Sequence, residues 1–146
     1  MDRAEILLVE DNAGDALLVG QALAECPAPS RLHIARDGEQ ALQILQQQHF
    51  KPDLIILDLN IPKISGYGVL ALRPPAKRVP VVVFTASERE ADVSRALSLG
   101  AKDFIHKPMD LDAYAGAVRG MVEKWALRTE KSALASPEMG KTASIQ

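Results

Sequence analysis

The feature that most restricts the fold is an unbroken aliphatic run over residues 54–57, which ends on Asp58. A run with no polar break predicts a strand buried on both faces, as at the centre of a parallel sheet. Asp58 would then lie at the carboxyl end of this strand, on the edge where open α/β sheets bind ligands. A carboxylate there either caps a helix or reacts. The Ile61-Pro62 step leaves Asp58 too far upstream to cap the next helix, so we interpret Asp58 as a reactive group.

Strand-like and helix-like segments alternate along the rest of the chain. Further strands are predicted over residues 6–9, 31–35, 79–85 and 103–106. Helical spacing of apolar residues predicts helices over 15–25, 39–48, 66–72, 87–99 and from 110 onwards. Five βα units in succession predict an α/β fold with one doubly wound parallel sheet, right-handed crossovers and helices on both faces.

Short polar residues, glycine and proline mark the ends of these helices. Three residues are predicted N-caps, because their side chains can accept a hydrogen bond from the first turn: Asn12, Asp37 and Asp110. The segment 87–90 has the spacing of a capping box that begins with Ser87. We expect Gly100 to end that helix and Pro74 to halt the short helix over 66–72.

Composition limits the class of protein. The chain has 146 residues, of which 47% are hydrophobic and 25% charged, as in a globular domain with a substantial core. The formal net charge of −2 and the lack of a basic block argue against nucleic acid as a partner. The single cysteine, Cys26, excludes an internal disulfide. No apolar run reaches the roughly 18 residues of a membrane span, and no signal-peptide pattern is present, so we expect a cytoplasmic protein without membrane contact.

Polar groups follow the ends of four of the five predicted strands: Glu10 and Asp11, Asp58, Thr85 and Lys107. Parallel strands end at one edge of a sheet, so these side chains should converge. Carboxylates that share a small site need a cation, and oxygen ligands without a His or Cys cluster favour Mg²⁺. Asp11 and Asp58 would bind the ion directly and Glu10 through a water molecule. Thr85 and Lys107 would bind an anion, which completes a set of groups suited to phosphoryl transfer onto a carboxylate.

Four separated motifs resemble, in this order, the signature of response-regulator receiver domains of the CheY type. They are Glu10-Asp11-Asn12, Leu57-Asp58-Leu59-Asn60-Ile61-Pro62 with Gly66, Thr85-Ala86-Ser87 and Lys107-Pro108. The resemblance covers residues 4–127 and implies a flavodoxin-like, CheY-like sheet of order 2-1-3-4-5. Within this family, the segments Glu10-Asp11-Asn12-Ala13-Gly14-Asp15 and Asp58-Leu59-Asn60-Ile61-Pro62-Lys63 most resemble single-domain regulators that serve bacterial phytochromes.

The resemblance also implies a role for each matching residue. Asp58 would be phosphorylated by a histidine kinase, with Mg²⁺ held by Asp11, Asp58 and the backbone carbonyl of Asn60. Thr85 and Phe104 would form the switch, Thr85 moving toward the phosphoryl group and Phe104 filling the space it leaves. Phe104 lacks the hydroxyl that a tyrosine would bring to this position. A cis peptide bond before Pro108 is also implied.

The segment between Gly66 and Pro80 departs from the family pattern. It is a few residues shorter, and its double proline cuts the third helix. We expect this departure to alter local packing but not the site.

The expected function is that of a phosphorylation-controlled switch. We expect a receiver domain over residues 1–127, followed by a helix extension and flexible tail over 128–146, which is too short for an output module. Signalling would then depend on binding, through the face built by the fourth helix, fifth strand and last helix. The expected partners are a sensor histidine kinase, for which a bacteriophytochrome is a candidate, and a downstream protein or phosphotransfer partner. A homodimer is left open.

Three other functions are considered. A receiver-like docking or dimer module that works without phosphorylation is compatible with the same residues. A haloacid-dehalogenase-like phosphatase also uses an aspartate nucleophile, but Asn60 stands where its second acid would protonate the leaving group. A nucleotide- or flavin-binding module is disfavoured, because the acidic turn over residues 10–12 repels phosphate where a glycine-rich loop would bind it. We therefore expect no turnover of small molecules.

Overall fold

The computed structural model describes residues 3–74 and 79–127. These residues contain five strands: β1 (Ala4–Val9), β2 (Ser30–Ala35), β3 (Leu54–Leu57), β4 (Val81–Thr85) and β5 (Asp103–His106). Five α-helices follow them: α1 (Ala13–Ala24), α2 (Gly38–Leu45), α3 (Gly66–Leu72), α4 (Glu90–Ser98) and α5 (Leu111–Met121). A π-helical segment, η1 (Val122–Leu127), continues α5. The helix extension and tail predicted over 128–146 lie outside the described residues.

The five strands form one parallel sheet in the order β2-β1-β3-β4-β5, as predicted. The segment 54–57 is the central strand, and all four of its residues are buried. Burial of each such aliphatic side chain stabilises the fold by about 1.5–3 kcal/mol. The run that restricts the fold most strongly in the sequence is therefore also the centre of the core.

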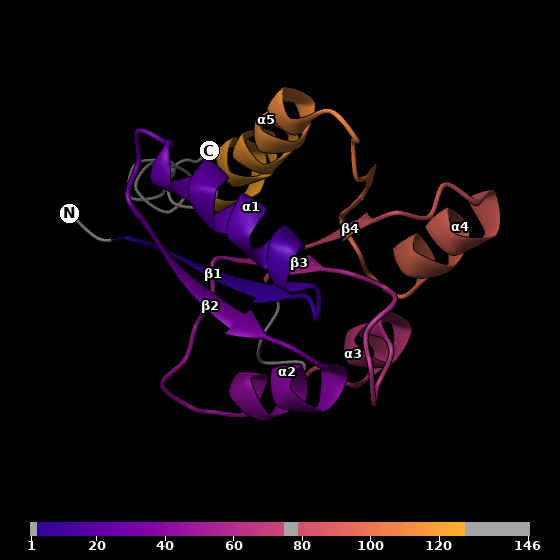
Figure 1. The fold of residues 1–146 in the computed structure, drawn as a ribbon. Helices are drawn as coiled ribbons and strands as arrows, with labels where there is room; N and C mark the ends of the chain where they lie inside the picture. The colour runs from indigo at the N-terminus through magenta and orange to yellow at the C-terminus, as the bar shows by residue number, and fades with distance from the viewer. Residues whose placement is uncertain (1–2, 75–78, 128–146) are drawn as a thin grey trace, which may run out of the picture.

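Helices cover both faces of the sheet (Figure 1). One core cluster joins α1 and α5 to alternate residues of the strands, among them Leu8, Ile56 and Phe84. A second cluster joins α2, α3 and α4 to the residues between them, such as Val9 and Leu57. Because neighbouring residues of a strand point to opposite faces, strands with a helical layer on each side must be apolar throughout. No helix within the described part of the chain is long and apolar enough to span a membrane.

The predicted N-caps are confirmed. The side chains of Asn12, Asp37 and Asp110 each accept a hydrogen bond from the backbone N–H three residues later, at 2.9, 2.7 and 2.8 Å. α3 ends at Leu72, ahead of Pro74, also as predicted. Its N-cap, Ser65, was not predicted.

The predicted capping box at Ser87 is wrong, because α4 begins three residues later, at Glu90. Arg89 is the N-cap residue and makes no side-chain capping bond. The Ser87 hydroxyl instead accepts a hydrogen bond from the Arg89 N–H and donates one to Asp92. These bonds fold residues 87–89 into a turn that holds the loop after β4 against the helix.

Gly100 ends α4, as expected. It follows the C-cap and has a φ of 107°, a conformation that only glycine adopts readily. The N–H of Ala101 bonds to the carbonyl of Ala96 at 3.1 Å, and that of Gly100 to Leu97 at 3.0 Å. This pair of bonds is the Schellman motif, which satisfies carbonyls left open at a helix end.

Candidate functional site

Side chains from four strand ends meet at the carboxyl edge of the sheet, around Asp58. Thr85 Oγ1 donates a hydrogen bond to Asp58 Oδ1 at 2.9 Å, and Lys107 Nζ donates to Oδ2 at 3.1 Å. Lys107 Nζ also donates to Glu10 Oε1 at 2.8 Å. Glu10, Asp58 and Thr85 are the buried polar or charged residues of the described chain. The convergence predicted from the strand ends is thus present for these four residues.

The register of the sheet explains this convergence. Leu57 pairs with Val9 on one side and with Val83 on the other, so the residues that follow these strands emerge side by side. The ladder extends one step past the strands, since the N–H of Asp58 bonds to the carbonyl of Val9 at 3.1 Å. Likewise the N–H of Lys107 bonds to the carbonyl of Thr85 at 2.7 Å. Backbone pairing therefore fixes where each functional side chain begins.

Lys107 contacts three carboxylates. Besides Glu10 and Asp58, its ammonium lies 3.2 Å from Oδ2 of Asp15, in the first turn of α1. The sequence analysis did not assign Asp15 to the site. The available signal was its place in the first turn of a helix that starts at the functional edge of the sheet, which also suits a residue that only stabilises the helix dipole.

Negative charge exceeds positive charge at this site. Burial and the nearby charge of Asp58 raise the pKa of Glu10 to about 7, against the opposing effect of Lys107. Burial alone would lower the pKa of Lys107, but its hydrogen bonds and the charges of Glu10 and Asp58 raise it well above the usual value. Lys107 is therefore always an ammonium ion, and three carboxylates share one cation.

The predicted metal ligands are only partly brought together. Glu10 and Asp58 share Lys107, whereas the side chain of Asp11 is exposed and makes no hydrogen bond or ion pair with a described residue. Asn60 lies next to Asp58, with its N–H 3.3 Å from Asp58 Oδ1. Among residues 3–74 and 79–127, no three His, Cys, Asp or Glu side chains are grouped closely enough to hold a metal ion. The oxygen donors and the excess of negative charge nevertheless fit a hard divalent cation such as Mg²⁺.

Two further expectations concern β5 and the loop after it. Phe104 lies half-buried on β5 and packs against the core cluster shared by α2, α3 and α4, with Val83 as its neighbour on β4. The implied cis peptide bond before Pro108 is absent, since the described residues contain no cis bond. The trans form is the ordinary state of a bond to proline, and here Lys107 reaches all its acidic partners with it.

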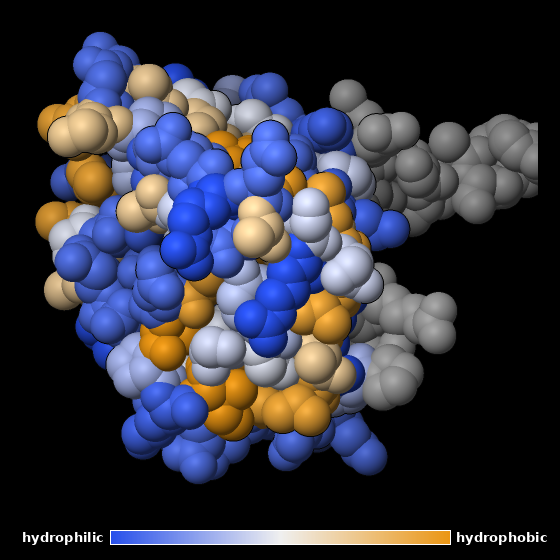
Figure 2. Space-filling view, turned by 90° about the vertical axis from the view of Figure 1, so that its right-hand side faces the viewer, coloured by the Kyte–Doolittle hydropathy of each residue, from blue (hydrophilic) through white to orange (hydrophobic). Residues whose placement is uncertain are grey.

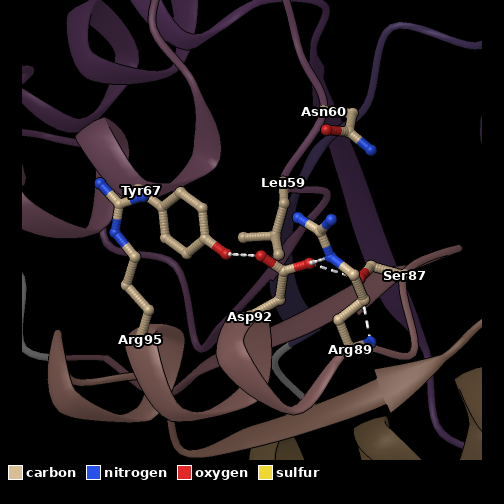
Figure 3. A pocket seen from close by; sticks show the side chains of 7 residues that line it. All are labelled: Leu59, Asn60, Tyr67, Ser87, Arg89, Asp92 and Arg95. Atoms are coloured by element: carbon tan, nitrogen blue, oxygen red, sulfur yellow. Dashed lines mark hydrogen bonds and ion pairs between the residues drawn. The ribbon is translucent and has the colours of Figure 1, made fainter.

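A polar cavity of about 360 Å³ lies beside this site (Figure 3). Its lining comprises Leu59, Asn60, Tyr67, Ser87, Arg89, Asp92 and Arg95. Asp92 is central, because it accepts hydrogen bonds from the hydroxyls of Tyr67 and Ser87 and from Arg89 Nε. The bonds from Ser87 and Tyr67 lower the pKa of Asp92. These contacts join the loop after β4 to both α3 and α4.

Tyr67 also contacts Arg95, another residue of the cavity lining. The Arg95 guanidinium carbon lies 3.9 Å from the centre of the Tyr67 ring, which is a cation–π contact. Burial and the hydrogen bond to Asp92 raise the pKa of Tyr67 to about 12, so its hydroxyl stays protonated and donates. Polar side chains that line the cavity therefore form a network of contacts next to the Asp58 site.

Comparisons with known proteins agree with this geometry. The chain matches the family described as response regulator receiver domain over residues 6–119. Response regulator Rcp1 from Synechocystis sp. is 40% identical over 128 residues, which cover 82% of this chain and 87% of Rcp1.

Two crystal structures from cyanobacterial systems are similar to the chain. The phosphorylated cyanobacterial phytochrome response regulator RcpA is 38% identical, with a TM-score of 0.79, over 85% of this chain and 94% of RcpA. The Mn²⁺-bound form of Rcp1 is 39% identical, with a TM-score of 0.77, over 84% of this chain and 94% of Rcp1. Both structures therefore share the fold of this chain over most of its length.

Proposed function

This chain belongs to the response regulator receiver domain family, and we propose that Asp58 accepts a phosphoryl group from a sensor histidine kinase. The observation that carries the proposal is the environment of Asp58. Both of its carboxylate oxygens accept hydrogen bonds from groups that can also bind phosphoryl oxygens, namely Thr85 and Lys107. The site lies at the sheet edge where ligands reach such folds.

The chemistry follows from these groups. An oxygen of Asp58 attacks phosphorus, the bond from phosphorus to the donor nitrogen breaks, and the donor histidine leaves with the electron pair and a proton. The negative charge on the phosphoryl oxygens is stabilised by the ammonium of Lys107 and the hydroxyl of Thr85. Lys107 already lies 3.1 Å from Asp58 before the reaction, whereas Thr85 would move toward the phosphoryl group as part of the switch.

A divalent cation is the proposed cofactor. The similar protein Rcp1 has been described in a Mn²⁺-bound form, and we propose Mg²⁺ for this chain. Asp11, Asp58 and the backbone carbonyl of Asn60 would hold the ion, with Glu10 acting through a water molecule. When bound, the ion neutralises charge on the phosphoryl group and the acids around it.

The proposed partners follow from the similar proteins. Because RcpA is a phytochrome response regulator, we propose a phytochrome-type histidine kinase as donor and a downstream protein or phosphotransfer partner as target. Pairing with such a kinase would place the chain in the cytoplasm. Thr85 and Phe104 would carry the switch, in a receiver domain over residues 1–127.

The output face would be built by α4, β5 and α5. Three apolar side chains on or beside these elements are exposed: Leu97 by 45%, Leu111 by 65% and Met109 by 97%. Figure 2 shows the molecule from the α4 side, where hydrophobic surface lies between hydrophilic residues. A surface of this mixed kind suits a partner that binds reversibly, and a second copy of the chain is one such partner.

The test is phosphorylation by acetyl phosphate in the presence of Mg²⁺, followed by the mass of the intact protein. We expect one added phosphoryl group in the parent and none in Asp58→Asn. Asp53→Asn is the matched control, because Asp53 lies just before the same strand but at its opposite end, bonded to the N–H of Glu5. A phosphoryl group that persists in Asp58→Asn, or is lost in Asp53→Asn, contradicts the assignment. No modification of the parent would favour the docking module, and steady release of phosphate from a generic phosphomonoester would favour the phosphatase.

A further inference from the structure

Lys107 is linked to helix α5 through Asp15. One oxygen of Asp15, Oδ2, lies 3.2 Å from Lys107 Nζ. The other, Oδ1, accepts a hydrogen bond of 2.7 Å from the hydroxyl of Tyr114. Asp15 comes from α1, Tyr114 from α5 and Lys107 from the loop after β5, so three separate elements meet in two contacts.

Tyr114 is held firmly in its place. Its side chain is buried, and its ring packs edge-on against Phe84 of β4, with the ring centres 5.0 Å apart. Phe84 directly precedes Thr85, so the hydroxyl of Tyr114 is fixed relative to the Asp58 site. Burial and the hydrogen bond to Asp15 raise the pKa of Tyr114 above its usual value, and the hydroxyl therefore acts as a donor.

Asp15 is held just as firmly from the other side. Its backbone N–H donates to Oδ1 of Asn12, the N-cap of α1, at 2.9 Å. The carboxylate is thus anchored at its backbone by α1 and at one oxygen by α5. The remaining oxygen is the one that faces Lys107.

The three acidic residues around Lys107 differ in whether they have another role in the proposed function. The ammonium of Lys107 donates hydrogen bonds to Glu10 and Asp58, and Asp15 is its third acidic neighbour, at ion-pair distance. In the proposed function, Asp58 bonds to phosphorus and Glu10 serves the metal site. Asp15 has neither task, so it can keep its contact with Lys107 while the other two acids change partners.

We propose that Asp15 and Tyr114 are positioning residues that hold the Lys107 ammonium at the phosphoryl site. Asp15 acts on Lys107 directly, and Tyr114 acts by orienting Asp15. This inference rests on the proposed function, because it concerns the rate at which Asp58 is phosphorylated. It also makes a statement about Lys107 that can be measured without any phosphoryl donor.

The first experiment measures the initial rate of Asp58 phosphorylation by acetyl phosphate with saturating Mg²⁺. Asp15→Asn should lower this rate about five- to tenfold, since the change removes one charged contact that orients Lys107. Tyr114→Phe should lower it about two- to threefold, because the carboxylate remains but is less well oriented. Asp112→Asn is the matched control and should leave the rate unchanged. Asp112 occupies the first turn of α5 and is exposed, so its change removes an equivalent first-turn charge from another helix without touching Lys107.

A mutant cycle decides whether Asp15 acts through Lys107. In a Lys107→Ala background, Asp15→Asn should change the phosphorylation rate by less than about twofold, because the group that it positions is gone. An equal loss in both backgrounds means that Asp15 only supports the structure, and the proposal fails.

The second experiment observes the ammonium signals of isotope-labelled lysine side chains by NMR, without a phosphoryl donor. In the parent, Lys107 should give a sharp, slowly exchanging signal that broadens or disappears in Asp15→Asn. Tyr67→Phe is the control for a lost tyrosine hydroxyl, because Tyr67 bonds to Asp92 and not to Asp15. That variant should leave the Lys107 signal unchanged, whereas Tyr114→Phe should broaden it.

The outcomes separate this inference from the proposed function. If the parent is phosphorylated on Asp58 but Asp15→Asn reacts at the same or a higher rate, the positioning role is wrong and the proposed function stands. If the parent is not phosphorylated at all, the proposed function fails, and the Lys107 signal still decides whether Asp15 and Tyr114 hold the ammonium.

Discussion

At the scale of single residues, the site holds more carboxylate oxygens than side-chain groups that donate hydrogen bonds to them. The two oxygens of Asp58 accept hydrogen bonds from Thr85 and Lys107, and Lys107 also forms ion pairs with two other acids. A buried acid with a share of one cation is costly to ionise, and Glu10 is the residue where this cost is largest. An additional positive charge at the site would offset this imbalance.

The raised pKa of Glu10 predicts how stability depends on pH without metal. The folded chain ionises this carboxyl near pH 7, whereas an unfolded chain ionises it near its ordinary value of 4.5. As pH rises through that interval, the unfolded chain loses this proton first, so the Glu10 contribution to stability falls. Glu10→Gln removes the effect.

The measurement is the melting temperature in metal-free buffer at about pH 5 and about pH 8. We expect Glu10→Gln to gain stability relative to the parent as the pH is raised. Glu123→Gln, a change of an exposed glutamate in η1, controls for the loss of one carboxylate. A Glu10→Gln variant that falls behind the parent as the pH rises would show that the acid is ionised readily in the fold.

The residues of the site divide into those that sequence can find and those that it cannot. Asp58, Thr85 and Lys107 are recognisable because each ends a strand, and parallel strands end together. Asp15 and Tyr114 are not, since each has an adequate local explanation, one as a first-turn acid and the other as part of an apolar helix face. Their pairing depends on the contact of α1 with α5, 99 residues apart in the chain.

At the scale of elements, the strands follow from local patterns and the loops do not. Asn12, Asp37 and Asp110 begin helices with bonds that span three residues, so sequence alone locates them. The start of α4 was placed wrongly because Ser87 bonds to Asp92 as well as to its own turn. Asp92 is in turn held by Tyr67 of α3, a contact that no local pattern reveals.

The N-terminus of α3 lies against the loop that carries Asp58. A Cβ atom added at Gly66 would lie 2.6 Å from the carbonyl oxygen of Asp58 and 2.8 Å from Cα of Leu59. Both neighbours are backbone atoms and cannot move aside easily. We therefore expect Gly66→Ala to reduce the free energy of unfolding by about 1–3 kcal/mol and to slow Asp58 phosphorylation.

Denaturant unfolding of Gly66→Ala measures this effect, and Gly120→Ala is its control. A Cβ at Gly120, in α5, meets no atom within 4 Å. That variant should be more stable than the parent by about 0.5–1 kcal/mol, because alanine favours a helix over glycine. Equal effects of the two substitutions would mean that the contact behind Asp58 is not tight.

At the scale of the whole molecule, one sheet separates two hydrophobic core clusters, and its parallel strands end at a common edge. Fold class and the site edge could be predicted because apolar runs and strand ends carry that information, whereas the strand order followed from the resemblance to receiver domains. The coupling between the layers could not, because it arises from side chains such as Tyr114 that cross from a helix to the site.

Metal binding should be visible in the stability of the entire chain. A cation held by residues at the ends of β1 and β3 binds the folded state alone, so it must stabilise it. At about 100 times the dissociation constant, Mg²⁺ should add about 2.7 kcal/mol to the free energy of unfolding. Asp11→Asn and Asp58→Asn should abolish the increase, and Asp53→Asn should retain it. An increase shared equally by all three variants would place the ion elsewhere.

The contact between Lys107 and Glu10 joins positions 97 residues apart. During synthesis, Glu10 therefore cannot pair with Lys107 until almost the whole domain has left the ribosome. A nascent chain that ends before residue 107 could bury most of its sheet and still present Asp58 without the ammonium. In the proposed function, the ammonium that stabilises the phosphoryl oxygens would thus be the last part of the site to arrive.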